Sequence, residues 1–232
     1  MVYNWLRSNL LPLRFSHCRL CAGLADQPGS LCRACLADMP HNHHPCPRCG
    51  AALSQSTTTP CGECQRNPPH FDHAHIPYRY APPLIPFITS LKFHGRLADA
   101  RLLGNLFLAS LATASYPLPE CLIPVPLHPI RLRERGFNQA VELARPLSKK
   151  LHLPLEAHAL QRCRHTRPQS ELSGATRRRN LRHAFRPDAP LPYQHVALID
   201  DVVTTGSTLN ELARVLRQSG VKTIQIWAIA RA

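Results

Sequence analysis

Four cysteine pairs of the form Cys-x-x-Cys occupy the first 64 residues of this 232-residue chain and restrict how that stretch can fold. Two intervening residues let both thiolates turn toward one tetrahedral ion, so each pair supplies half of a four-cysteine zinc site. The four pairs therefore predict two structural Zn²⁺ ions. The predicted ligands are Cys18, Cys21, Cys32, Cys35, Cys46, Cys49, Cys61 and Cys64.

Neighbouring cysteine pairs are separated by 10 or 11 residues, a length that suits a hairpin and favours ligands taken sequentially, first pair with second and third with fourth. An interleaved cross-brace is the alternative. A third interpretation is that the cysteine pairs are redox-active. The sequence argues against it, because the pairs do not lie in a thioredoxin-like βαβ unit. With eight thiols available, we expect the nearby His17, His41, His43 and His44 to be exposed rather than ligands.

The charge balance indicates a polyanionic partner. Lys and Arg number 28 against 14 for Asp and Glu, a formal net charge of +14, and such a field attracts nucleic acids and phosphorylated small molecules. No apolar run reaches the roughly 18 residues of a membrane span, and the N-terminus lacks the features of a secretory signal. We therefore expect a cytoplasmic protein without membrane insertion, whose reduced thiols favour metal over disulfides.

Composition changes near residue 66, which predicts a Cys-rich zinc module over 1–66 and an α/β domain over 67–232. Apolar periodicity predicts helices over 85–93, 97–114, 138–151 and 207–219, and strands over 121–127, 195–199 and 221–230. Pro146 is expected to kink or break its helix. Alternating strands and helices with short connections indicate a parallel sheet with right-handed crossovers.

The apolar strand 196–199 delivers Asp200 and Asp201 at its end, directly before a turn that opens a helix. Two carboxylates there can accept hydrogen bonds from ribose hydroxyls, while the turn offers amides, hydroxyls and the helix dipole to a phosphate. Gly206 lets the backbone approach the phosphate. Ligands of open α/β sheets bind at this carboxyl edge.

The string Asp-Asp-Val-Val-Thr-Thr-Gly-Ser-Thr at 200–208 resembles the ribose-phosphate signature of type I phosphoribosyltransferases. The resemblance implies that Asp200 and Asp201 contact ribose. It implies that the 5-phosphate of phosphoribosyl pyrophosphate, or of a related sugar phosphate, is cradled by Thr204, Thr205, Gly206, Ser207 and Thr208. Purine-salvage members often carry Asp where this chain has Thr204, which argues against purine salvage. Mg²⁺ would suit the diphosphate and ribose oxygens.

Two arginine-rich segments are candidates for contact with pyrophosphate or nucleic acid, because guanidinium groups bind phosphates in bidentate fashion. The first precedes a glycine at a helix entrance and contains Arg131, Arg133 and Arg135. The second, rich in Pro, Gly and Ser, is expected to be a mobile loop running into a basic helix. It contains Arg162, Arg167, Arg177, Arg178 and Arg179. A merely solvated basic face is the alternative interpretation.

Several motifs taken together resemble the ComF family: the cysteine-rich N-terminus, Leu-Lys-Phe-His-Gly at 91–95, Pro-Val-Pro-Leu at 124–127 with the arginines and Gly-Phe-Asn-Gln-Ala that follow, and the loop at 200–208. The match implies a phosphoribosyltransferase-like fold with helices on both faces of its sheet and an intracellular role in taking up or using external DNA. A zinc module beside an Arg-rich domain suits single-stranded DNA binding. The candidate stacking aromatics are Phe71, Tyr78, Tyr80, Phe93 and Phe137.

Three hypotheses for function remain open at this point. The first is a DNA-processing or DNA-uptake factor that binds a phosphoribosyl ligand. The second is an active phosphoribosyltransferase that acts on an unknown acceptor. The third is a non-enzymatic adaptor that binds proteins of the DNA-uptake machinery through its zinc module and sheet. Outside the four pairs, Cys121 is expected to be a core residue, and Cys163 has no assigned role.

Overall fold

The computed structural model of the protein describes residues 16–25, 30–112, 114, 116–163 and 184–232. Contacts divide the chain into two compact units, Met1–Met39 and Pro40–Ala232. The second cysteine quartet belongs to the second of these units and packs with residues that follow it. The Asn42 amide donates to the carbonyls of Gly50 (2.9 Å) and Ile76 (3.2 Å), and Arg48 donates to Pro69 (3.1 Å).

In its described residues, 16–25 and 30–39, the smaller unit shows a short hairpin followed by one helical segment. Strands β1 (Ser16–His17) and β2 (Leu24–Ala25) pair antiparallel, with Ser16 opposite Ala25. Helix α2 (Arg33–Ala37) follows and buries Cys35. Such a small unit has too little apolar surface to stabilise itself, which is the usual circumstance of a metal-stabilised module.

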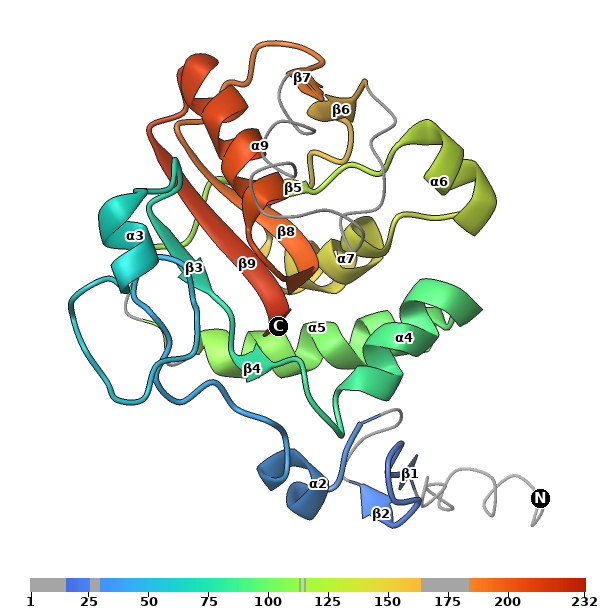
Figure 1. Cartoon of the computed structure of the whole chain (residues 1–232). Coiled ribbons are helices and arrows are strands. Elements are labelled where there is room, and N and C mark those ends of the chain that lie inside the picture. The colour runs from blue at the N-terminus through green and yellow to red at the C-terminus, as the bar shows by residue number, and fades with distance from the viewer. Residues whose placement is uncertain (1–15, 26–29, 113, 115, 164–183) are drawn as a thin grey trace, which may run out of the picture. The chain divides into compact units, whose positions relative to one another are not determined.

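A parallel sheet organises the larger unit (Figure 1). Its strand order is β3–β9–β8–β5, and β4 also pairs with β9; each of these pairings is parallel. The strands are β3 (His73–His75), β4 (Tyr78–Arg79), β5 (Cys121–Pro124), β8 (His195–Val203) and β9 (Thr223–Arg231). The expected parallel sheet is confirmed. Strand β8 extends past the expected end at residue 199, so Asp200 and Asp201 belong to the strand itself.

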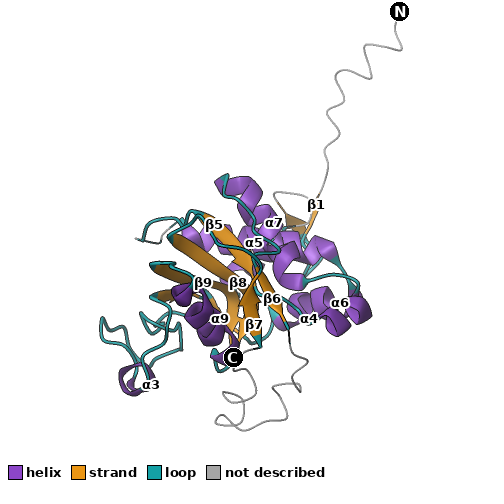
Figure 2. Cartoon of the chain, turned by 90° about the horizontal axis from the view of Figure 1, so that it is seen from above, coloured by secondary structure: helices purple, strands orange, loops and turns teal. Residues whose placement is uncertain are grey.

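Helices cover both faces of this sheet, as expected (Figures 1 and 2). Those of the larger unit are α3 (Gly62–Arg66), α4 (Ile85–His94), α5 (Leu97–Leu111), α6 (Pro129–Arg135), α7 (Gln139–Leu151) and α9 (Ser207–Gln218). Helices α5 and α7 lie on one face, where Phe107 packs against Trp227 with ring centroids 5.4 Å apart. Helix α9 lies on the other face and buries Leu212 and Leu216 in a cluster with Leu198.

Helix α7 runs through Pro146, so of the two outcomes expected there, a kink or a break, the break does not occur. The neighbouring helix α5 carries Gly104 at the point of closest approach, where a Cβ would lie 2.6 Å from Pro146 Cγ. The close packing of the two helices, with Leu143 and Leu147 buried, holds the proline in helical geometry. Tertiary packing thus outweighs the local preference of proline.

Several of the described elements were not expected from the sequence, among them one helix and one pair of strands in the larger unit. Helix α6 follows β5 directly, and a small antiparallel pair joins β6 (Leu160–Arg162) to β7 (Phe185–Pro187). The core position expected for Cys121 is observed, since its side chain is fully buried. Within the described ranges, none of the helices combines the length and hydropathy needed to cross a bilayer.

Candidate functional site

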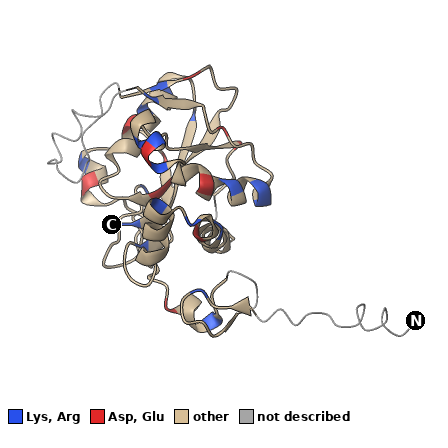
Figure 3. Ribbon diagram, turned by 90° about the vertical axis from the view of Figure 1, so that its right-hand side faces the viewer, with Lys and Arg blue, Asp and Glu red and all other residues tan. Residues whose placement is uncertain are grey.

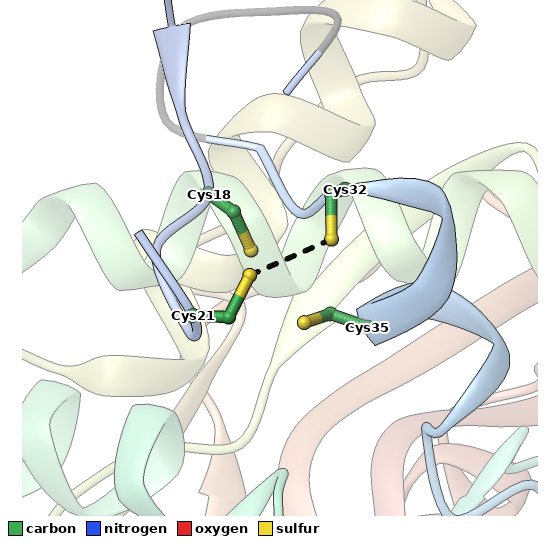
Figure 4. Close-up of side chains that lie close together, drawn as sticks. All are labelled: Cys18, Cys21, Cys32 and Cys35. Atoms are coloured by element: carbon green, nitrogen blue, oxygen red, sulfur yellow. Dashed lines mark hydrogen bonds between the residues drawn. The ribbon is translucent and has the colours of Figure 1, made fainter. Parts of the chain in front are cut away.

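Each cysteine quartet brings four sulfurs into one cluster. The clusters are Cys18, Cys21, Cys32 and Cys35, and Cys46, Cys49, Cys61 and Cys64, with all sulfurs of a cluster within 4.8 Å of one another. In the first cluster the side chains converge, with Cys21 and Cys32 Sγ 3.7 Å apart (Figure 4). A tetrahedral zinc with Zn–S bonds of about 2.3 Å places its sulfurs about 3.8 Å apart. The sequential arrangement of ligands is confirmed, and both sites fit Zn²⁺.

The two clusters repeat one backbone design. The amide of Cys18 donates to the Gly23 carbonyl, and that of Ala22 donates back to Cys18; Cys46, Gly50 and Ala51 repeat this pattern. The fourth residue after the first cysteine is left-handed in both cases, with φ of +59° at Ala22 and +69° at Gly50. Helices α2 and α3 then begin immediately after the third cysteine of each cluster. Backbone amides point at sulfur in both clusters: Leu20 N lies 3.4 Å from Cys18 Sγ, and Cys61 N lies 3.2 Å from Cys46 Sγ.

These amides help ionise one thiol in each cluster. Burial opposes ionisation of Cys18 and Cys46, but hydrogen bonds from backbone amides outweigh it, lowering the pKa of Cys18 to about 6 and of Cys46 to about 7. The hydrogen bond with Cys32 and burial raise the pKa of Cys35, while burial and the neighbouring thiol of Cys49 raise that of Cys64. A divalent cation would stabilise all four thiolates together, since ligand thiols must be deprotonated.

The expected phosphate loop connects β8 to α9 at the carboxyl edge of the sheet. Thr204 and Thr205 are exposed, and Gly206 is left-handed at φ +74° and forms the N-cap of the 12-residue helix. The hydroxyls of Thr205 and Ser207 lie 2.9 Å apart. The Thr205 hydroxyl also accepts the Ser207 amide at the start of α9, at 3.4 Å. This turn therefore combines two hydroxyls, a helix N-terminus and a glycine, which together suit an anion.

The two carboxylates before the loop have different surroundings. Asp201 is 2% exposed, and its Oδ2 lies 2.5 Å from Lys92 Nζ at the end of α4. Asp200 is half-buried, and its Oδ1 accepts the Asp201 amide at 2.9 Å. Burial and then the charge of Asp201 raise the pKa of Asp200 above its usual range. Asp201 is thus fixed by its ion pair with Lys92, while Asp200 retains access to solvent.

Three of the expected arginines lie on α6 rather than at the entrance of α7. Arg131, Arg133 and Arg135 precede Gly136, whose φ of +81° ends α6, and Asn138 then caps α7 by accepting the Ala140 amide at 3.0 Å. Arg131 and Arg135 line an open pocket of about 430 Å³ together with Lys92. The pKa of Arg135 is lowered by burial, although the charge of Asp201 opposes this shift.

The remaining arginines are divided between described and undescribed parts of the chain. Arg162 lies on β6, its guanidinium 5.6 Å from the Phe185 ring, and its pKa is lowered by burial and by the charge of Arg131. Arg167, Arg177, Arg178 and Arg179 lie outside the described residues. Lys and Arg occur on several helices of the larger unit as well as on its loops (Figure 3).

Comparison with known proteins agrees with this architecture. The double zinc ribbon domain matches residues 7–65, and the phosphoribosyl transferase domain matches residues 138–232. Competence protein F of Haemophilus influenzae is 38% identical over 231 residues, covering 97% of this chain and 99% of the relative. DNA utilization protein YhgH of Shigella flexneri is 39% identical over 205 residues, covering 87% and 90%. The chain belongs to the ComF family.

In this ComF protein the second zinc site lies close to the phosphate loop. A pocket of about 360 Å³ is lined on one side by Cys61 and Cys64 and on another by Thr205 and Ser207. The Asn210 side chain of α9 accepts the amide of His70, in the segment that connects this zinc site to β3. The segment that follows the second cysteine quartet is therefore joined by a hydrogen bond to α9, the helix that the phosphate loop opens.

Sequence reasoning about this ComF protein missed Lys92 and the helix that carries the first arginines. Lys92 belongs to the Leu-Lys-Phe-His-Gly string, which carried the family resemblance but gave no reason to pair it with Asp201. The structure also sorts the candidate aromatics: Phe71 and Tyr78 are each 4% exposed and belong to the core, whereas Phe93 is 71% exposed.

Proposed function

We propose that this protein takes part in the uptake or use of external DNA in the cytoplasm, binding single-stranded DNA and a phosphoribosyl compound. The printed names of the relatives, competence protein F and DNA utilization protein, support the cellular role. The net charge of +14 supports a polyanionic partner. Proteins of the DNA-uptake machinery are the protein partners that this role would require.

The phosphate loop is the single observation that carries the ligand class. The 5-phosphate would lie against Thr205, Gly206 and Ser207, where a left-handed glycine leaves room beside the N-terminus of α9. The hydroxyls of Thr204 and Thr208 would complete the cradle. Half-buried Asp200 would accept the ribose hydroxyls, with Asp201 fixed behind it by Lys92. The second phosphate group of a phosphoribosyl pyrophosphate would bring Mg²⁺ with it.

The arginines of α6 supply a counter-charge close to this loop. Lys92 pairs with Asp201 and also lines the pocket that contains Arg131 and Arg135. A pyrophosphate or a DNA phosphate in that pocket would meet two guanidinium groups and one ammonium group. Arg133 is exposed on the same short helix. We include Arg162, Arg167, Arg177, Arg178 and Arg179 in the proposed DNA contact on the strength of their charge alone.

Calorimetry with phosphoribosyl pyrophosphate and Mg²⁺ tests the ligand. Asp200→Asn keeps the shape of the side chain but removes its charge, so binding should weaken on the order of 2 kcal/mol. Asp188→Asn is the matched control, because Asp188 is exposed and does not belong to the loop. Absence of binding by the wild-type protein would refute the phosphoribosyl site. Assay of pyrophosphate release in the presence of bases and oligonucleotides then separates ligand binding from transfer.

A further inference from the structure

Phe93 is the most exposed large hydrophobic side chain in the described part of the chain, at 71%. It is the next-to-last residue of α4, which ends at Gly95 with a left-handed φ of +62°. The packing of this helix does not depend on it, since Phe87, Ile88 and Leu91 form the buried face. A single exposed aromatic is common on protein surfaces, so its neighbours decide whether it has a role.

The neighbours of Phe93 form a cationic pocket. Lys92, Arg131, Arg135 and Phe137 line it with Phe93, and its volume of about 430 Å³ falls within the roughly 300–1,000 Å³ of small-ligand sites. The lining residues come from the end of α4, from α6 and from the turn that follows α6. One carboxylate, Glu134, also lines the pocket, but it is paired with Arg131 at 3.1 Å. The remaining lining charge is therefore positive.

The Phe93 ring lies beside the guanidinium group of Arg135. Arg135 Cζ lies 5.7 Å from the centroid of the Phe93 ring, a cation–π distance, yet most of the ring stays open to solvent. Phe137 is held against the end of α4, where a Cβ on Gly95 would lie 3.6 Å from its Cε1. An aromatic surface beside guanidinium groups is the combination that binds a nucleic-acid base together with its phosphate.

We propose that this pocket binds one nucleotide of single-stranded DNA, with the base stacked on Phe93 and a phosphate bound by Arg131 and Arg135. This inference rests on the proposed DNA binding and assigns it a base-stacking site. Exposed Arg96 and Arg133 are next in sequence to the lining residues Gly95 and Glu134, and they would receive the phosphates of neighbouring nucleotides. Because every base has an aromatic face, the site would tolerate any sequence.

The proposed nucleotide site adjoins the proposed phosphoribosyl site. Lys92 lines the pocket, and its Nζ lies 2.5 Å from Asp201 Oδ2, so one side chain borders both. The same pocket chemistry would also accept a free mononucleotide. The two possible ligands differ in the phosphates that lie outside the pocket. An oligonucleotide gains affinity from these phosphates, whereas a mononucleotide has no phosphate outside the pocket.

The experiment uses the full-length zinc-containing protein and a thymidine oligonucleotide carrying one 2-aminopurine, whose fluorescence is quenched on stacking. Phe93→Leu removes the aromatic ring but keeps apolar bulk, and should weaken binding about tenfold and abolish the quenching. Phe93→Trp should restore both. The salt dependence of affinity should not change in either variant, because the phosphate contacts remain. Leu97→Ala is the matched control, since Leu97 is 51% exposed next to α4 but does not line the pocket.

Each result bears on the proposal. An oligonucleotide containing an abasic site should bind the wild-type protein as weakly as the intact oligonucleotide binds Phe93→Leu. Equal affinity and equal quenching in wild type and Phe93→Leu would overturn the stacking site while leaving DNA binding intact. If the wild-type protein bound no oligonucleotide, the proposed DNA function itself would fail. Quenching of 2-aminopurine riboside monophosphate by wild type but not Phe93→Leu would then assign the pocket to a free nucleotide, and lack of quenching would reject it.

Discussion

Lys92 Nζ and Asp201 Oδ2 lie 2.5 Å apart and join the end of α4 to the end of β8, two segments more than 100 residues apart in the sequence. The Asp201 side chain is 3% exposed and that of Lys92 is 23% exposed, so the carboxylate depends on this partner more than the ammonium does. The ion pair fixes the position of Asp201 near the start of the phosphate loop. It also connects the loop to the pocket that Lys92 and Phe93 line.

Replacing Lys92 by Met should therefore destabilise the larger unit. The change leaves a buried carboxylate without its partner, at a cost on the order of 3 kcal/mol at neutral pH. The double variant Lys92→Met with Asp201→Asn removes both charges and should recover part of that loss. Urea denaturation of the four proteins gives the coupling energy. Additive effects of the two single changes would mean that the pair contributes nothing to folding.

The two zinc sites should differ in what they stabilise. The wild-type protein should contain two zinc ions by elemental analysis, and Cys18→Ser and Cys46→Ser should each retain about one. Structural zinc supplies roughly 10 kcal/mol or more of apparent folding energy to small modules. Only the second site lies in the compact unit Pro40–Ala232, where Asn42 bonds to Gly50 and Ile76.

Scanning calorimetry should accordingly show a lower Tm for the larger unit in Cys46→Ser, by about 5 °C or more, and no change of that transition in Cys18→Ser. If neither variant moved the transition, the two ribbons would form one module and the boundary expected near residue 66 would stand. The matched substitution in each cluster controls for the general effect of losing a thiol.

Several parts of the fold could be predicted because they depend on local pattern. The Cys-x-x-Cys spacing predicts four-sulfur clusters, and apolar periodicity predicts α4, α5, α9 and the central strands to within a few residues. The turn chemistry at Gly206 follows from its place between a strand and a helix. Each of these signals lies within about 20 consecutive residues.

What could not be predicted depends on contacts between distant segments. Lys92 falls at helical spacing with the buried Leu91 and Ile88, and its partner is identified only when α4 meets β8. Helix α6 buries no residue, so it has no apolar periodicity to reveal it. The continuity of α7 at Pro146 depends on Gly104 in another helix.

Stability should fall in mild acid because of a buried histidine. His75 Nε2 lies 2.9 Å from the Ser110 hydroxyl, and its ring packs edge-on against Phe107 at 5.1 Å. Burial, with a smaller contribution from the charge of His73, lowers the pKa of His75 to about 4. The unfolded state, with a His pKa of about 6.5, takes up the proton first as pH falls. The contribution of His75 to the free energy of unfolding is therefore fully present above pH 6.5. It is lost as the pH falls from 6.5 to about 4.

His75→Gln should flatten this dependence. Between pH 7 and pH 5 the wild-type protein should lose on the order of 1 to 2 kcal/mol through this group, and the variant should lose correspondingly less. His158→Gln is the control, since His158 is exposed. Urea denaturation at the two pH values measures the difference. An identical slope for wild type and His75→Gln would show that other groups cause the acid sensitivity.

Gly206 and Gly220 flank α9 and allow a test that separates backbone strain from ligand binding. Both glycines are left-handed, with φ of +74° and +96°, and a Cβ would meet no atom closer than 3.8 Å at Gly206 and none within 4 Å at Gly220. Substitution by Ala should therefore destabilise the protein similarly at both positions, by roughly 1 kcal/mol, because each forces an L side chain into a left-handed conformation.

Only Gly206 belongs to the proposed phosphate cradle, where a methyl group would meet the incoming phosphate. Calorimetry should show phosphoribosyl pyrophosphate binding weakened tenfold or more by Gly206→Ala, which is about 1.4 kcal/mol, and unchanged by Gly220→Ala. Equal binding by the two variants would exclude the loop as the phosphate site, even if their losses of stability matched.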